Sequence, residues 1–131
     1  MIIDSSAVLA ILLQESDGRR YLRAVLDAEP RRMSVSNWLE ASMVVDRRGN
    51  ALAVNWLEDF MRNARIELMP VSVSQATIAR RAWSTFGRGV HPARLNYGDC
   101  FAYALAKETR EPLLFKGNDF AQTDVEPALK D

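Results

Sequence analysis

The sequence predicts an α/β fold, namely a three-layer α/β/α sandwich around a central, mainly parallel sheet of four to five strands. Short apolar runs alternate with longer amphipathic segments along the chain, which is the order of strands and helices in a sheet with right-handed crossovers. The apolar runs lack polar alternation, as expected of strands that are covered on both faces. With 131 residues, the chain has the length of one domain, so we expect residues 1–131 to form a single unit.

The first half of the chain is expected to contain two strands and four helices. The first strand is wholly apolar and is expected at the centre of the sheet, with Asp4 at its carboxyl end. Ser5 and Ser6 are expected to cap the helix that follows, and Ser36 or Asn37 to cap the third helix. The expected strands are 1–3 and 33–35, and the expected helices are 7–14, 19–28, 36–48 and 51–64, the third of them ended by Gly49 and Asn50.

The second half of the chain is expected to add two helices, two strands and a third, short strand at the edge of the sheet. Asn96 is the expected N-cap of the last helix, with Asp99 in its first turn. The segment 87–95 is expected to be a loop with His91 at the surface, because it combines glycine, proline and charge without periodicity. The expected strands are 66–71 and 112–115, the expected helices are 72–86 and 100–108, and a short edge strand is expected between Asp124 and Pro127.

Composition excludes several classes of protein. Hydrophobic residues make up 48% of the chain and charged residues 26%, which is typical of a globular protein rather than a disordered one. No apolar run approaches the roughly 18 residues of a membrane span, and no secretory signal is recognisable, so we expect a cytoplasmic protein with no membrane partner. The single cysteine, Cys100, and the single histidine, His91, exclude an internal disulfide and a cysteine–histidine zinc site.

Charge and one helix pair suggest contacts with partners. The formal net charge is zero, so the molecule as a whole does not attract nucleic acid. Arginines are nevertheless clustered, which fits either an RNA path or a solvated surface. The helices at 36–48 and 51–64 are expected to form a hairpin that contacts a second subunit. The arginine clusters are Arg19–Arg20, Arg31–Arg32, Arg47–Arg48 and Arg80–Arg81.

Four acidic residues are expected at one edge of the sheet, each at the end of a strand or early in the next helix. Like charges brought together there cannot all stay ionised without a counter-charge. Oxygen ligands favour Mg²⁺ or Mn²⁺, and such ions suit hydrolysis of phosphodiesters by activated water. A capping box at Glu40 and a simple dipole interaction at Asp99 remain open as alternatives. The four acids are Asp4, Glu40, Asp99 and Asp119.

Four segments carry a family resemblance, at 1–10, 36–41, 95–106 and 113–120. In this order they resemble the PIN-domain ribonucleases, and within them the VapC toxins of bacterial toxin–antitoxin pairs. The resemblance implies a PIN-like fold and an endoribonuclease that depends on Mg²⁺ or Mn²⁺. It also implies an RNA substrate, a cognate VapB-type antitoxin and a homodimer. The residues that match the metal-binding and catalytic acids of the family are Asp4, Glu40, Asp99 and Asp119, and those that match its supporting polar residues are Ser6 and Asn96.

One departure from the family pattern concerns the loop before the last acid. Many relatives have an additional aspartate where this chain has Gly117 or Asn118. Asn118 can offer an amide oxygen to a metal but brings no charge, which favours one tightly held ion over two.

Two other functions remain open from the sequence. A non-catalytic PIN-fold binding module would keep the fold without turnover. A phosphoacceptor signalling domain would also gather acids and Mg²⁺ at the end of a parallel sheet, with Lys116 as its lysine. That class needs an acceptor aspartate after a middle strand, and the run 66–71 ends without one.

Overall fold

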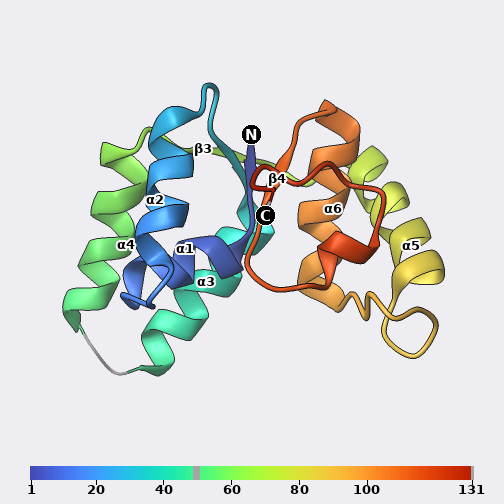
Figure 1. Cartoon of the computed structure of the whole chain (residues 1–131), viewed down its shortest axis with the longest axis horizontal. Coiled ribbons are helices and arrows are strands. Elements are labelled where there is room, and N and C mark those ends of the chain that lie inside the picture. The colour runs from blue at the N-terminus through green and yellow to red at the C-terminus, as the bar shows by residue number, and fades with distance from the viewer. Residues whose placement is uncertain (49–50, 131) are drawn as a thin grey trace.

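The computed structural model describes residues 1–48 and 51–130, and within them it contains a parallel sheet between two groups of helices (Figure 1). The strand order is β3-β2-β1-β4, so β1 lies inside the sheet as predicted. Ile2 pairs with Arg32 on one side and with Leu113 on the other, both in parallel register. The strands are β1 (Ile2–Ile3), β2 (Arg32–Ser34), β3 (Glu67–Met69) and β4 (Leu113–Leu114).

The two faces of the sheet are covered by separate hydrophobic cores. Successive side chains of a strand point to opposite faces, so Ile3 and Leu114 enter one core whereas Ile2 and Leu113 enter the other. Among the described residues, four helices build the first core and two build the second, and the two groups stand apart in Figure 1. The three-layer prediction is therefore confirmed. The first group is α1 (Ser5–Leu12), α2 (Gly18–Asp27), α3 (Val35–Arg47) and α4 (Ala51–Asn63); the second is α5 (Val73–Phe86) and α6 (Tyr97–Thr109).

The start of α1 differs from the prediction. Asp4 is the N-cap, and its carboxylate accepts a hydrogen bond from the backbone N–H of Ser6 at 3.0 Å. Ser5 and Ser6 are therefore the first residues of the helix rather than its caps. Asp4 acts as the N-cap because its carboxylate can accept a hydrogen bond from a free N–H group of the first turn.

The start of α3 also lies earlier than predicted. Ser34 is the N-cap and accepts a hydrogen bond from the backbone N–H of Ser36, so neither Ser36 nor Asn37 caps this helix. Glu40 consequently lies beyond the first turn, and the capping box considered for it is absent. Its carboxylate remains available for tertiary contacts.

Three further boundaries were predicted incorrectly or fall outside the described residues. The strand expected at 66–71 is shorter, and the expected edge strand is reduced to a bridge between Leu113 and Pro127. The predicted helix end at Gly49 and Asn50 lies outside the described residues. Within residues 1–48 and 51–130, no helix is both long and apolar enough to cross a bilayer.

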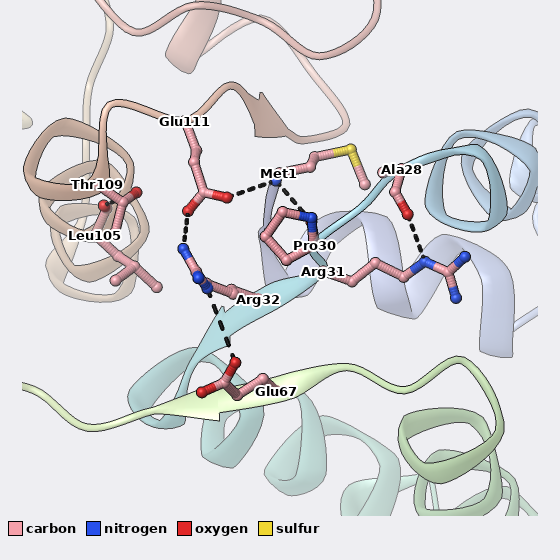
Figure 2. Close-up of polar contacts among 9 residues, drawn as sticks. All are labelled: Met1, Ala28, Pro30, Arg31, Arg32, Glu67, Leu105, Thr109 and Glu111. Atoms are coloured by element: carbon pink, nitrogen blue, oxygen red, sulfur yellow. Dashed lines mark hydrogen bonds and ion pairs between the residues drawn. The ribbon is translucent and has the colours of Figure 1, made fainter.

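Charged groups are paired at the end of the sheet where the strands begin (Figure 2). The amino group of Met1 and the guanidinium of Arg32 each lie 2.9 Å from an oxygen of the Glu111 carboxylate, and Arg32 also lies 3.9 Å from Glu67. Burial alone would raise the pKa of Glu111, but the hydrogen bonds from Met1 and Arg32 hold that pKa below its usual range. These contacts join β1, β2 and β3 to the segment that enters β4.

Candidate active site and metal centre

Asp4 is a buried carboxylate at the carboxyl end of β1, and only 3% of the residue surface is exposed. Its Oδ2 accepts hydrogen bonds from the N–H of Ser6 at 3.0 Å and from the Ser6 hydroxyl at 2.6 Å. Its Oδ1 is buried and has no hydrogen-bond partner among the described residues. Burial raises the pKa of Asp4 to about 6, and the charge of Glu40 adds to this rise. One oxygen is thus fixed by the protein, and the other receives no hydrogen bond from residues 1–48 or 51–130.

Ser6, predicted as a supporting residue, links Asp4 to the loop after β4. Its hydroxyl donates to Asp4 and accepts a hydrogen bond from the backbone N–H of Lys116 at 3.0 Å. The side chain of Lys116 turns away from Asp4, because its Nζ lies 3.0 Å from both Glu15 and Asp17. Ser6 therefore connects one carboxylate oxygen of Asp4 to the backbone of the loop that follows β4.

Glu40 reaches from α3 toward the beginning of α6. Its Oε1 accepts a hydrogen bond from the Ser5 hydroxyl at 2.6 Å. A Cβ atom placed on Gly98 would lie 2.2 Å from Oε2 of Glu40, so the carboxylate rests directly on the backbone of α6. Asn37, one turn before Glu40, donates from Nδ2 to the Gly98 carbonyl at 2.9 Å. Glu40 is held between α1 and α6.

Asp99 lies in the first turn of α6 and forms a capping box with Asn96. The backbone N–H of each residue donates to the side-chain oxygen of the other, and both distances are 2.9 Å. The prediction that Asn96 caps this helix is confirmed. Surrounding protein atoms raise the pKa of Asp99 to about 7, and the charges of the other three predicted acids add to this rise, namely Asp4, Asp119 and Glu40. Asp99 therefore lies within electrostatic reach of the whole predicted set.

Asp119 and Asn118 belong to the loop that follows β4. Asp119 precedes the short helix η1 (Phe120–Gln122) and makes no side-chain cap. Asn118 lines a cleft of about 370 Å³ together with Arg20 and Lys130. Asp124 lies elsewhere, because its carboxylate accepts a hydrogen bond from the Tyr103 hydroxyl at 2.7 Å and pairs with Lys107 at 3.1 Å. The charge of Asp119, like those of Asp4 and Glu40, acts on Asp99, whereas Asp124 is paired with Lys107.

The acid cluster has the chemistry of a site for a hard cation, although it is not a closed cage. In the part of the chain that the structure describes, no three acidic, histidine or cysteine side chains are close enough to hold an ion together. Carboxylate oxygens are nevertheless the ligands that Mg²⁺ and Mn²⁺ prefer. The Oδ1 of Asp4, which has no hydrogen-bond partner in the part of the chain that the structure describes, is a buried acceptor that a cation would satisfy. On chemistry, these residues fit such an ion.

Sequence reasoning missed three residues that shape this site. Ser5 was expected to cap a helix but instead donates to Glu40. The hydrogen bond between Asn37 and Gly98, which joins α3 to α6, was not predicted. The available signals were a polar residue in an apolar stretch and a glycine within the first turn of a helix, where glycine is unfavourable unless something approaches closely.

Comparisons with known proteins identify the family. The chain matches the PIN domain family over residues 1–126. It is 45% identical over 130 residues to ribonuclease VapC28 of Mycobacterium tuberculosis, covering 98% of both chains. It is also 44% identical over 125 residues to ribonuclease VapC of Mycolicibacterium smegmatis, covering 95% of this chain and 97% of that one.

Two solved structures share the fold. The crystal structure of M. tuberculosis VapC20, described as a sarcin-ricin loop cleaving toxin, superposes with a TM-score of 0.71 at 16% identity, covering 96% of this chain and 98% of that one. A toxin-antitoxin complex from Klebsiella pneumoniae gives a TM-score of 0.70 at 15% identity, covering 94% and 92%. With relatives this similar over nearly their whole length, the chain belongs to the PIN-domain family and, within it, to the VapC ribonucleases.

Proposed function

We propose that this protein is an endoribonuclease toxin of a VapBC-type pair that hydrolyses RNA phosphodiester bonds with the help of Mg²⁺ or Mn²⁺. The observation that carries the proposal is the cluster of acids around Asp4, whose buried Oδ1 has no hydrogen-bond partner among the described residues. Two of the similar proteins are named as ribonucleases, which agrees with RNA as the substrate. Residues 1–131 would form the single domain that performs this reaction.

The roles of the residues follow from their surroundings. Asp4, Glu40, Asp99 and Asp119 would hold the ion, which when bound supplies positive charge that activates water and stabilises charge on the phosphate. Ser6 and Asn96 orient two of these carboxylates through hydrogen bonds. Asn118 adds an uncharged oxygen in the same loop as Asp119. Because the chain has a single histidine, a serine–histidine or cysteine–histidine nucleophile would have to use His91.

His91 is unsuited to that role because of its surroundings. Its Nδ1 accepts a hydrogen bond from the backbone N–H of Ala93 at 3.0 Å, and its ring packs edge-on against Phe86. The ring therefore organises its own loop. Hydrolysis by activated water is the reaction that the remaining residues support.

The position of Lys116 argues against a phosphoacceptor signalling domain. In that class the lysine must reach the acidic site, whereas Lys116 pairs with Glu15 and Asp17.

The non-catalytic alternative has no observation in its favour beyond the neutral residue at Asn118. The cleavage experiment below separates it from the main proposal.

We infer a VapB-type antitoxin and a homodimer as partners. A toxin-antitoxin complex is among the structural neighbours. Helices α3 and α4, the predicted hairpin, expose large apolar side chains. A contiguous exposed apolar patch of this kind marks an interaction site. Light scattering of the purified toxin, alone and with the antitoxin, would give both stoichiometries. These exposed residues are Leu39, Met43, Leu52 and Trp56.

One of the arginine clusters, Arg31–Arg32, makes contacts within the fold. Arg31 donates to the backbone carbonyls of Leu26, Ala28 and Ala64, and Arg32 pairs with Glu111. This cluster therefore stabilises the fold, and an RNA path would use other arginines.

The decisive experiment is cleavage of a structured RNA mixture by the purified protein with Mn²⁺ or Mg²⁺. We expect cleavage to stop with EDTA and to fall at least about a hundredfold in Asp4→Asn, because Asp4 would lose its charge toward the ion. Asp124→Asn is the matched control, since this acid lies outside the cluster, and it should cleave normally. Full activity of Asp4→Asn would refute the mechanism, and a folded wild-type protein that cleaves no RNA would favour the binding module.

A further inference from the structure

Asn37 is the fully buried polar residue of α3 that faces the beginning of α6. Its Nδ2 donates to the Gly98 carbonyl at 2.9 Å across 61 residues of sequence. Its Oδ1 is buried and has no hydrogen-bond partner in the described part of the chain. Burying an amide with one unsatisfied oxygen is unfavourable, so an apolar side chain would be the simpler choice for stability alone.

The partner of Asn37 lies between two of the proposed metal-binding acids. Gly98 directly precedes Asp99, whose carboxylate is fixed by its capping box with Asn96. The α-carbon of Gly98 also rests against Glu40, since an added Cβ would lie 2.2 Å from its Oε2. The position of Gly98 relative to α3 therefore sets the separation of the Glu40 and Asp99 carboxylates.

The two acids repel each other, as the contribution of Glu40 to the raised pKa of Asp99 shows. The hydrogen bond from Asn37 to Gly98 joins α3 to α6 beside these like charges. A lysine or arginine would do so by neutralising the acids and would compete with a bound cation. A neutral amide holds the backbone and leaves the negative charge of the site intact.

We propose that Asn37 is a positioning residue, which fixes the distance between Glu40 and Asp99 for a divalent cation by holding the backbone of Gly98 against α3. The proposal rests on the proposed metal-dependent function and extends it to a residue that itself lies outside the acid set. Groups that orient metal ligands in this way typically contribute about tenfold to a hundredfold to affinity.

The test compares Mn²⁺ binding by isothermal titration calorimetry in wild type, Asn37→Leu and Val45→Ala. Leucine has a similar size but no donor, so we expect Mn²⁺ affinity to fall about tenfold to a hundredfold. Val45 is fully buried on the same helix, and its truncation should lower stability while leaving Mn²⁺ affinity unchanged. Asn37→Ser keeps a donor on a shorter side chain, so its loss of Mn²⁺ affinity should lie between that of Asn37→Leu and that of Val45→Ala. If the leucine variant does not fold, Asn37→Ser is the test, and an affinity equal to that of Val45→Ala would overturn the positioning role.

Hydrogen exchange at the start of α6 supplies a readout that needs no metal. In Asn37→Leu the backbone N–H groups of Asp99 and Cys100 should exchange faster than in Val45→Ala. Wild-type affinity for Mn²⁺ in Asn37→Leu, or an equal loss in Val45→Ala, would overturn the positioning role. A wild-type protein that binds no Mn²⁺ would instead count against the proposed function, and unchanged exchange in Asn37→Leu would then overturn the positioning role by itself.

Discussion

Glu111 and Asp4 lie at opposite ends of the same parallel sheet and have opposite electrostatic surroundings. Glu111 meets the amino group of Met1 and the guanidinium of Arg32 (Figure 2), and its pKa is lowered. Asp4 is buried and lies near Glu40, and burial together with this like charge raises its pKa to about 6. The ion pairs at the beginning of the strands stabilise the fold. Burial of an ionised Asp4 at their end opposes folding, and the proposed cation would relieve this cost.

The largest expected effect comes from breaking the paired end. Glu111→Gln would leave the Met1 amino group and Arg32 without their counter-charge, so the free energy of unfolding should fall by about 3 kcal/mol. Because the pKa of Glu111 is lowered in the folded state, its contribution is present above the ordinary pKa of about 4.5 and is lost as pH falls through the folded-state value. Urea unfolding at neutral pH checks this, and a variant as stable as wild type would contradict it.

At the acidic end of the sheet, the affinity for a divalent cation should depend on pH. The pKa of Asp99 is about 7 and that of Asp4 about 6, so both carboxyls take up protons as pH falls from 7.5 to 5.5. A protonated carboxyl is a poor metal ligand, and we expect Mn²⁺ affinity to fall by about a hundredfold over this range. Calorimetric titration at the two pH values measures it, with Asp4→Asn as the control that should show a shallower dependence. Affinity that does not change with pH would show that these acids do not bind the ion.

A smaller and more specific effect is expected at the contact between α3 and α6. Gly98→Ala would place a methyl group where Glu40 now lies, so the Glu40 side chain must move. Mn²⁺ affinity should fall about tenfold, while the fold persists because alanine favours helix over glycine by about 1 kcal/mol. Circular dichroism and Mn²⁺ titration of the same sample separate the two effects. A variant with wild-type affinity would show that the Glu40 position is not critical.

Much of the fold could be predicted because it depends on local sequence. The apolar triplet before Asp4 and the Asn96–Asp99 pair each carry their own strand or helix signal, and the structure agrees with both. The cap of α3 was misplaced because serines stand at both Ser34 and Ser36, and only the end of β2 decides between them.

The remaining part of the site depends on tertiary packing. The Asn37–Gly98 hydrogen bond spans 61 residues, and no local pattern pairs an asparagine in one helix with a glycine in another. The same holds for Ser5 and Glu40, which meet only because α1 and α3 share a face of the sheet. The sequence therefore indicated the acids and two of the groups that hold them, Ser6 and Asn96. It did not indicate the tertiary contacts of Ser5, Asn37 and Gly98.

The central claim is that the acidic end of the sheet is relieved by a divalent cation, and unfolding of wild type and Asp4→Asn with and without Mn²⁺ at pH 7 tests it most directly. Because the pKa of Asp4 is raised from 3.8 to about 6, its ionisation costs folding about 3 kcal/mol once pH exceeds 6. Without Mn²⁺, Asp4→Asn should be more stable than wild type by about that amount, since asparagine also caps helices well. Saturating Mn²⁺ should stabilise wild type by roughly 2–3 kcal/mol and the variant much less. Equal stabilisation of both proteins, or of neither, would contradict the claim.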